Sequence, residues 1–522
     1  MTSFDVLLSG GTVVDGTGGI PYAADLGVSD GRIAAIGDLG SAEAGTTIDA
    51  RDRLLMPGFI DTHVHADAVL GSGEVQEAML RQGITSVILG QDGLSFAPAS
   101  RATVDYVARY FAAVDGAPPA ELADGCTVAG LLDHYDRRTR INVAYLVPLG
   151  TVRHEVLGAG DRPVGDDLPA LLRLVEEGLD QGAVGISTGL EYVPGAFADL
   201  AELTALCVPA ARLGAPYVSH LRSYADGTAP GMPEAQALGQ ATGVPVHVSH
   251  YRGLAEPLLE RLASCAAADV DVTFDVYPHL FGNTILAMKA LPSYVQEGGV
   301  NATLRRLADP DVRKELSASW FPAVQPALAA ATFGFVAAQE FRWAEGCTLA
   351  EASERSGLEF GTLVCDILLA SDLAVGAIVP SPGGDETDVR VLVRDDRHMA
   401  CSDGIYLGGH PHPRGWAAFA RFLGHHTREL GDWTWAQAAR HLAGLPAERF
   451  QLAGRGVLAE GAVADIAVVD PRTVADRATY ADPRQLAAGV DDVLVAGEPV
   501  LTAGILRDPT PGRALRRGDP GP

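Results

Sequence analysis

The chain has 522 residues, of which 47% are hydrophobic and 20% are charged, and its formal net charge is −27. A chain of this length can bury a large core, and this balance of residues is typical of a globular protein rather than a disordered one. The negative charge disfavours binding to nucleic-acid phosphates and to anionic lipid head groups, because like charges repel. We therefore expect no nucleic-acid partner and no membrane partner.

The cysteines and the amino terminus bear on the cellular compartment. The six cysteines stand far apart and form no CxxC pair, which excludes a zinc ribbon and gives no sign of a disulfide framework. The opening stretch MTSFDVLLSGG does not resemble a signal peptide. No apolar run approaches the roughly 18 residues that a membrane helix needs. These features predict a cytoplasmic protein.

Both ends of the chain are predicted to form β-structure. The first 57 residues contain short alternating runs such as FDVLLSGGTVVDG, separated by Gly and Asp. The carboxyl-terminal end has the same character in GVLAEGAVADIAVVDP and DDVLVAGEPVLTAG. Such runs favour small antiparallel sheets. We predict one small β-sandwich domain that is assembled from residues 1–57 and 454–522.

Between these ends, apolar strands alternate with helical stretches, which is the pattern of a parallel α/β fold. Eight strand candidates are found, at residues 58–65, 83–92, 141–150, 182–192, 215–222, 244–252, 271–279 and 398–404. Eight strands are what a (β/α)8 TIM-type barrel requires, and such barrels carry their chemistry at the carboxyl ends of the strands. We predict this barrel over residues 58–453.

One interval is too long for this pattern. More than a hundred residues separate the last two strand candidates, whereas a βα unit usually needs roughly 30. We predict an inserted subdomain between strands 7 and 8, at about residues 285–350, that can act as a lid over the barrel mouth. The alternative is that strand 7 or strand 8 lies elsewhere.

Histidines at the strand ends point to a metal. In the first strand His63 and His65 stand two apart, so both imidazoles face the same side and can reach one ion. Two further strands end in Ser-His, at His220 and His250. One such histidine is usually a packed core residue, but four at three strand ends favour a metal site. Asp403 ends the last strand, where a carboxylate can ligate an ion or take a proton from water.

Other polar side chains stand at the same predicted edge. Strand 4 ends in Glu191 and Tyr192, and strand 7 offers Asp275, Tyr277 and His279. If the barrel forms, these side chains all surround one mouth, because the strands are parallel.

The chain resembles the amidohydrolase superfamily in the stretch PGFIDTHVHAD, in its strand-end histidines and in the motif SDG. Within it, the chain is similar to the N-acyl-D-amino-acid deacylases (D-aminoacylases). The supporting stretches are GITSVILGQDGLSFAP, GAVGISTGLEYVPG, PYVSHLRS, VSHYRG, TFDVYP, HPHPRGWAAFARFLG and RATYADPRQLAAGVDDVLVAGEPV, which cover nearly the whole chain in order. The resemblance implies a barrel with a flanking β-sandwich, and zinc-dependent hydrolysis of N-acyl-D-amino acids to a carboxylic acid and a free D-amino acid.

The resemblance also implies roles for single residues. His220 and His250 match the ligands of a tightly held zinc, and His63 and His65 match the pair that can hold a second metal. Asp403 matches the aspartate that acts as general base and then as general acid.

The chain departs from the family at the end of strand 2. The family has a glycine-flanked cysteine there as a zinc ligand, whereas this chain has Asp92. A carboxylate can bind one ion or bridge two, and as a harder ligand it can shift selectivity toward another divalent metal. No lysine stands at a strand end as a bridge, so Asp92 is our first candidate for that role and Glu191 the second. We expect one or two zinc ions (Zn2+), with another divalent metal as the alternative.

The free carboxylate of such a substrate needs a cationic or hydroxyl clamp. Arg222 and Arg252 stand two residues beyond their histidines and project to the same side if the strands continue. Arg414 follows the last strand, and arginine suits bidentate carboxylate binding. Tyr192 and Tyr277 are the hydroxyl candidates. The alternative is that some of these arginines pair with Asp67, Glu191 or Asp275 instead.

Two other functions stay open. A cyclic-amide hydrolase of the hydantoinase or dihydropyrimidinase type shares the barrel, although the missing strand-end lysine and the deacylase-like carboxyl-terminal stretches argue against it. A non-catalytic assembly protein with this fold would have lost ligands, whereas the histidines and Asp403 are present. The preferred acyl group, the amino-acid side chain and the oligomeric state are not given by the sequence.

Overall fold

The structure is a computed structural model that describes residues 3–223, 227–381 and 383–519. Eight parallel strands form its centre, and their order in the sheet follows their order in the chain. They are β6 (Phe59–Asp61), β8 (Ile84–Leu89), β11 (Asn142–Pro148), β12 (Gly185–Gly189), β13 (Tyr217–His220), β14 (Val246–Val248), β15 (Val272–Val276) and β19 (His398–Ala400). The predicted eight-stranded parallel barrel is confirmed, and each strand is shorter than expected. Every residue in these strands is buried, as in parallel sheets covered on both faces.

The first and last strands meet through a short parallel pair. It joins β7 (Val64–His65) to β20 (Gly404–Ile405), directly after β6 and β19. Beside it, the backbone N–H of Asp403 donates to the carbonyl of His63 at 2.8 Å. The barrel is therefore nearly closed at the edge where the predicted metal ligands stand.

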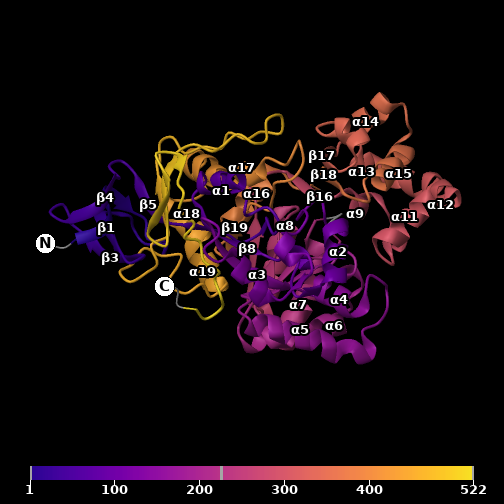
Figure 1. The fold of residues 1–522 in the computed structure, drawn as a ribbon, viewed down its shortest axis with the longest axis horizontal. Helices are drawn as coiled ribbons and strands as arrows, with labels where there is room; N and C mark the ends of the chain where they lie inside the picture. Colours follow the sequence, from indigo (N-terminus) through magenta and orange to yellow (C-terminus); the bar gives the residue numbers. More distant parts are fainter. Residues whose placement is uncertain (1–2, 224–226, 382, 520–522) are drawn as a thin grey trace.

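Helices surround the barrel (Figure 1). Helix α5 (Leu168–Asp180) illustrates why: its buried residues, Leu171, Val175, Gly178 and Leu179, recur at helical spacing and face the sheet. The other helices that follow barrel strands are α1 (Gly73–Leu80), α2 (Arg101–Tyr110), α3 (Val128–Tyr135), α4 (Leu149–Leu157), α6 (Leu200–Arg212), α7 (Met232–Thr242), α8 (Ala255–Ala267), α16 (Glu386–Val393), α17 (Arg414–Arg421), α18 (Trp435–Ala439) and α19 (Leu445–Arg449). A two-stranded pair, β9 (Ala99–Ser100) and β10 (Gly125–Cys126), lies between β8 and α3 in the chain.

Both ends of the chain enter one sheet of nine strands. Its amino-terminal strands are β1 (Ser3–Val13), β2 (Tyr22–Ser29), β3 (Arg32–Gly37), β4 (Glu43–Asp49) and β5 (Leu54–Pro57), and its carboxyl-terminal strands are β21 (Ile466–Val469), β22 (Val490–Val495), β23 (Glu498–Thr502) and β24 (Ile505–Leu506). The two sets meet where β5 pairs antiparallel with β21. The indigo and yellow strands accordingly lie side by side in Figure 1.

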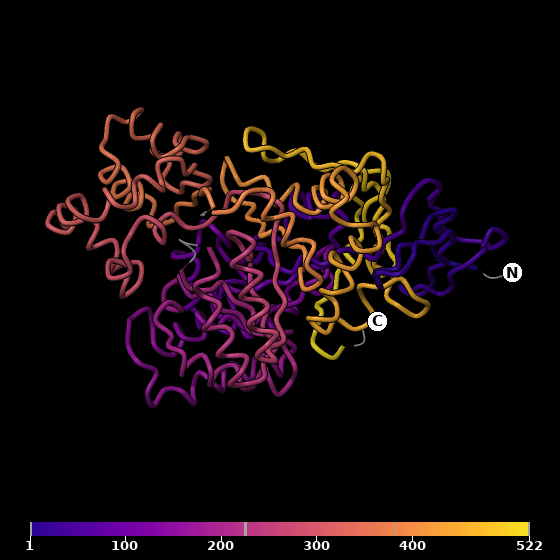
Figure 2. Tube along the Cα trace, turned by 180° about the vertical axis from the view of Figure 1, so that it is seen from behind, coloured from indigo at the N-terminus to yellow at the C-terminus, as the bar shows by residue number. Residues whose placement is uncertain are grey.

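The chain between β15 and β19 forms a further group of elements. Strands β16 (Phe281–Ile285), β18 (Val375–Pro380) and β17 (Thr332–Val336) make an antiparallel sheet in that order. The helices are α9 (Leu286–Ala290), α10 (Ser293–Gln296), α11 (Val300–Ala308), α12 (Pro310–Glu315), α13 (Phe321–Leu328), α14 (Leu349–Ser356) and α15 (Phe360–Ala370). Figures 1 and 2 both show this group at the end of the molecule remote from the amino-terminal strands.

The structure also describes the state of the cysteines and the length and apolar character of the helices. All six cysteines are free thiols. Within residues 3–223, 227–381 and 383–519, no helix has both the length and the apolar character needed to cross a bilayer.

Candidate metal centre

The five predicted ligands converge at the carboxyl ends of the barrel strands. The Nε2 atoms of His63 and His65 lie 3.4 Å apart, and His220 Nδ1 lies 3.2 Å from His250 Nε2. The Asp92 carboxylate stands between the two pairs. Its oxygens are 3.6 Å from ring nitrogens of His63, His65 and His220, and 3.7 Å from His250 Nε2. All five side chains are buried.

These separations fit a metal ion better than direct hydrogen bonds. Contacts of 3.6–3.7 Å are too long for good hydrogen bonds, whereas two ligand atoms each about 2.1 Å from a tetrahedral zinc stand roughly 3.4 Å apart. Asp92 Oδ1 is buried without a hydrogen-bond partner in the part of the chain that the structure describes. Two overlapping sets, His63 with His65 and Asp403, and His63 with Asp92 and His250, each place ligand atoms within 4.8 Å of one another. The residues therefore fit one or two zinc ions.

The backbone at the strand ends turns sharply to aim these side chains. Gly90, Asp92 and Gly93 all have positive φ, at 76°, 54° and 70°. A Cβ on Gly93 would lie 2.7 Å from a backbone nitrogen of β12, so only glycine fits this turn. His250 and Asp403 also have positive φ, at 36° and 47°. Non-glycine residues in this region are costly and tend to cluster at functional sites.

The electrostatics of the site favour a cation. Burial alone would raise the pKa of Asp92, but His220 and His63 hold that pKa well below its usual value. Burial alone would lower the pKa of His220, but Asp92 and Glu191 raise it to about 9. The pKa of His65 is raised well above its usual value, against burial, by the neighbouring carboxylates of Asp115 and Asp92. A divalent cation can replace the protons that this carboxylate-rich site attracts.

Carboxylates also hold the far sides of two histidine rings. His65 Nδ1 lies 3.1 Å from Asp115, and His220 Nε2 lies 3.3 Å from Glu191, which in turn pairs with Lys289 at 3.2 Å. Such partners fix the ring orientation of metal-binding histidines and leave the other nitrogen for the ion. Glu191 thus stands outside the ligand cluster, whereas the oxygens of Asp92 face both histidine pairs.

Asp275 lies beneath the ligands rather than at the barrel mouth. It is fully buried, and its oxygens accept hydrogen bonds from the backbone of His250 at 2.7 Å and from Cys401 Sγ at 2.9 Å. His247 Nε2 lies 2.9 Å from the same carboxylate. Asp275 therefore fixes the backbone that carries His250.

Asp403 is anchored on one side and faces the histidines on the other. Its Oδ1 lies 3.6 Å from His65 Nε2 and 3.8 Å from His63 Nε2. Its Oδ2 lies 2.8 Å from Nη1 of Arg414, a side chain with 0% exposure. The guanidinium of Arg414 also sits 4.5 Å from the ring centre of Tyr277. The prediction that Arg414 clamps the substrate is therefore corrected: its charge faces Asp403.

A cavity of about 340 Å³ opens in front of these groups, within the range typical of small-molecule sites. Its lining includes Tyr192, Arg252 and Tyr277, as predicted. The Arg252 guanidinium stacks on Tyr277 at 4.4 Å and donates through Nη2 to the carbonyl of His279. Its Nη1 is buried without a hydrogen-bond partner among the described residues. The hydroxyl of Tyr192 lies 2.9 Å from that of Thr284.

Arg222 is not brought to this cavity. Its Nε donates to Glu234 at 3.0 Å, and its Nη1 and Nη2 donate to the carbonyls of Ala196 and Ala198. The prediction assumed that strand geometry continues to residue 222, but β13 ends at His220. The side chain therefore turns away and forms an ion pair, although with Glu234 rather than with Asp67, Glu191 or Asp275.

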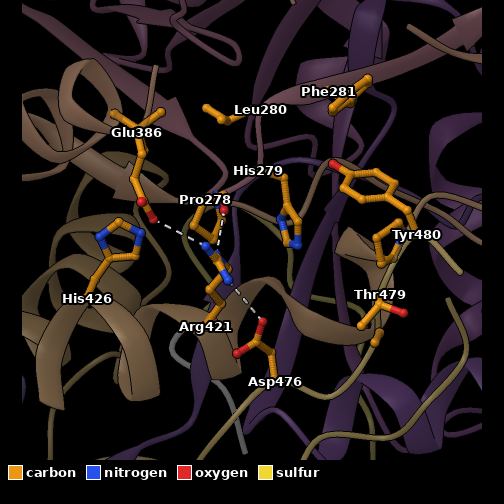
Figure 3. A pocket seen from close by; sticks show the side chains of 13 residues that line it. Pro278, His279, Leu280, Phe281, Glu386, Arg421, His426, Asp476, Thr479 and Tyr480 are labelled. Carbon is orange, nitrogen blue, oxygen red and sulfur yellow. Dashed lines mark hydrogen bonds and ion pairs between the residues drawn. The ribbon is translucent and has the colours of Figure 1, made fainter. Parts of the chain in front are cut away.

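His279 faces a different cavity of about 350 Å³. Figure 3 shows its ring between Arg421 and Tyr480, with Arg421 bound to Glu386 and Asp476. The strand β15 ends at Val276, so the expectation that His279 shares the barrel mouth is wrong.

Two side chains of the site carry no local sequence signal. Asp115 follows α2 in an irregular stretch, and Lys289 lies in α9, far along the chain from the barrel strands that it approaches. Only the fold places them beside His65 and Glu191.

Comparison with known proteins agrees with this geometry. The sequence profile of the Amidohydrolase family matches residues 46–501. The chain belongs to the amidohydrolase family. This amidohydrolase is 35% identical to an N-acyl-D-glutamate deacylase and 33% identical to a D-aminoacylase, both from Alcaligenes xylosoxydans xylosoxydans. The alignments cover 98% of this chain in each case, and 96% and 98% of the two relatives.

Solved structures show the same similarity to N-acyl-D-amino-acid deacylases. An N-acyl-D-glutamate deacylase from Bordetella bronchiseptica, complexed with zinc and a phosphonate mimic of the tetrahedral intermediate, matches with a TM-score of 0.82 at 32% identity. A D-aminoacylase described as having a binuclear metal centre matches with a TM-score of 0.82 at 30% identity. Each match covers 98% of this amidohydrolase and 100% of the other chain. A D-hydantoinase matches with a TM-score of only 0.56 at 18% identity, over 98% and 97% of the two chains, and shares the fold alone.

Proposed function

We propose that this amidohydrolase hydrolyses the amide bond of N-acyl-D-amino acids and releases a carboxylic acid and a free D-amino acid. The observation that carries the proposal is the cavity in which Asp403 and Arg252 stand beside four convergent histidines and Asp92. The names of the relatives, an N-acyl-D-glutamate deacylase and a D-aminoacylase, support the D configuration.

His63, His65, His220 and His250 would hold the metal together with Asp92, whose two oxygens face both histidine pairs. When bound, zinc supplies Lewis-acid activation of water and of the amide carbonyl. The histidines are then unavailable as bases, because the lone pairs that face the ion are committed to it.

Asp403 is the remaining carboxylate positioned to move a proton. Its Oδ1 faces the histidines while Arg414 holds its Oδ2. In the proposed reaction, Asp403 accepts the proton of the attacking water and then donates it to the leaving nitrogen. The amine then departs, because a protonated amine is a far better leaving group than an amide anion.

Arg252 is our candidate for the substrate carboxylate. Its Nη1 has no hydrogen-bond partner in the described chain, and stacking on Tyr277 orients the guanidinium. An anionic oxygen would satisfy that buried donor. Tyr192 and Tyr277 line the same cavity and complete the proposed binding surface.

We also propose the division into domains. Residues 1–57 and 454–522 would form a discontinuous β-sandwich, supported by the joint sheet and by a separate hydrophobic cluster that includes Leu8, Leu26 and Ile466. Residues 58–453 would form the barrel domain. The lid proposed at about 285–350 is extended to Pro380, because β16, β17 and β18 form one sheet. The six free thiols support the cytoplasmic location proposed from the sequence.

The test is turnover by the zinc-loaded enzyme of N-acetyl-D-methionine, its L enantiomer and hydantoin, with free amine and ring opening assayed in parallel. We expect turnover of the D substrate alone, and its loss in Asp403→Asn. Turnover of hydantoin alone would instead support a cyclic-amide hydrolase. A protein that binds no divalent metal and gains no activity on adding one would support the non-catalytic alternative.

A further inference from the structure

The cavity in front of the metal centre has an apolar wall that the proposed chemistry does not use. It is contributed by the chain between β15 and β19, and it includes Met288 of α9, Ala323, Val324, Ala327 and Leu328 of α13, and Val379 and Pro380 of β18. Val324, Ala327 and Leu328 recur at helical spacing and therefore form one face of α13. Val324 is half-buried and Ala327 is exposed, so this face offers uncovered apolar surface to a ligand.

Few cationic groups in the cavity are available to bind an acidic side chain of the substrate. Among the described residues that line it, the guanidinium and ammonium groups belong to Arg252 and Lys289. Lys289 Nζ lies 3.2 Å from Glu191. The Lys289 ammonium is therefore already paired with the Glu191 carboxylate.

We propose that this amidohydrolase selects N-acyl-D-amino acids whose side chains are apolar, and that the α13 wall receives that side chain. This inference rests on the proposed function, in which Arg252 takes the α-carboxylate. The substrate class differs from that of the relative named for N-acyl-D-glutamate, although that relative is 35% identical over nearly the whole chain.

The expected selectivity has a physical reason: placing a charged side chain against this apolar wall costs more free energy than placing an apolar one. A leucine side chain covers the apolar surface of Val324, Ala327 and Leu328 and releases the water there. A glutamate carboxylate would lose its hydration against the same surface and find Lys289 already paired. Discrimination between a side chain that a pocket satisfies and one that it does not is commonly about 100-fold.

The first experiment measures kcat/KM of the zinc-loaded enzyme for N-acetyl-D-leucine, N-acetyl-D-glutamate and the uncharged isostere N-acetyl-D-glutamine. We expect leucine to exceed glutamate by about 100-fold, with glutamine between them. Glutamate equal to or ahead of leucine would overturn the inference while leaving the proposed function intact. Failure to hydrolyse any N-acyl-D-amino acid would overturn the proposed function, and this inference with it.

A second series separates the side chain from the acyl group. N-acyl-D-alanines with acetyl, butanoyl and octanoyl groups keep the side chain constant while the acyl chain lengthens. We expect kcat/KM to depend more on the D side chain than on this lengthening. A strong rise with acyl length, without preference between leucine and glutamate, would assign the wall to the acyl group and refute our assignment.

A charge placed on the wall should redirect specificity. Ala327→Arg adds a guanidinium on an exposed position that lines the cavity, and Gln325→Arg adds the same group on an exposed position of α13 outside the lining. We expect Ala327→Arg to raise the glutamate-to-leucine ratio of kcat/KM about tenfold or more, and Gln325→Arg to leave it unchanged. Equal ratios in folded samples of both variants would contradict the placement of the side chain.

Discussion

Replacing Arg414 with methionine removes the charge that faces Asp403 and keeps a side chain of similar length. Arg414 has 0% exposure, and its Nη1 lies 2.8 Å from Asp403 Oδ2. None of its three guanidinium nitrogens makes a regular hydrogen bond among the described residues, so the ion pair with the Asp403 carboxylate is what offsets its charge. The variant therefore leaves a buried carboxylate without its cation.

The expected magnitude follows from that geometry. Breaking a buried ion pair by removing one partner costs about 3–5 kcal/mol. The lower end applies here, since a bound metal beside His63 and His65 would offset part of the Asp403 charge. A loosely held Asp403 would also lose much of its value as general base and acid, which is commonly worth 100-fold or more in rate. We expect a loss of about 3 kcal/mol in the free energy of unfolding and a fall of about 100-fold in kcat.

The assay combines denaturant unfolding at fixed zinc concentration with kcat on N-acetyl-D-methionine. The double variant Arg414→Met/Asp403→Asn removes both charges and should regain most of the lost stability without regaining activity. Arg222→Met is the matched control, because it deletes an arginine paired with Glu234 outside the cavity. Wild-type stability and kcat in Arg414→Met would show that Asp403 does not depend on the Arg414 charge.

Three further predictions concern other parts of the structure. Asp92→Ala should lower zinc content and kcat together, whereas Asp92→Cys should retain zinc through its thiolate; full zinc content in Asp92→Ala, measured by elemental analysis, would contradict this. Arg252→Met should raise KM about tenfold or more for N-acyl-D-amino acids, because a charged hydrogen bond to the carboxylate is lost, and an unchanged KM would exclude the clamp. Burial lowers the pKa of His154 to about 4, although Glu155 opposes the shift. The unfolded chain then binds the proton more readily, so stability should fall by about 1–2 kcal/mol from pH 6.5 to pH 5. In His154→Phe, which keeps the stacking on Tyr106 at 4.0 Å, urea unfolding should show a smaller loss, and an equal loss would contradict the assignment.

The barrel and its ligands could be predicted because their sequence pattern is local. Each barrel strand is a short apolar run, and the polar residue that ends it follows directly in the chain. His63, His65, Asp92 and Asp403 were found in this way. The rule that parallel strands present their carboxyl ends at one edge then brought them together. The separations of 3.4–3.8 Å between these side chains agree with that reasoning.

The predictions failed where a strand ended earlier than its sequence suggested. Arg222 and His279 were placed by extending β-geometry beyond His220 and Val276, where the strands β13 and β15 stop. Beyond a strand end, turn geometry decides where a side chain points, and alternation no longer applies. Arg414 was placed at the right edge of the barrel, but its buried pairing with Asp403 depends on tertiary packing.

The apolar cavity wall and the charged side chains behind the histidines could not be predicted from the sequence, because they come from segments outside the barrel strands. Asp115 and Lys289 reach the site from segments outside the barrel strands, and α13 follows β15 after a long stretch of other elements. Helical spacing can identify an apolar face, but it does not say whether that face packs against protein or lines a cavity. The proposed selectivity for apolar side chains therefore needed the three-dimensional arrangement.

Metal content and turnover, determined on the same samples, show whether hydrolysis depends on a metal bound at the histidine cluster. The enzyme is stripped with a chelator, its fold is verified by circular dichroism, and zinc is then added back in small steps while bound metal and kcat on N-acetyl-D-methionine are determined together. We predict that the stripped enzyme stays folded and inactive, and that turnover returns in proportion to zinc bound at the histidine and Asp92 cluster. Undiminished turnover in a sample shown to contain no divalent metal would exclude a metal-dependent reaction.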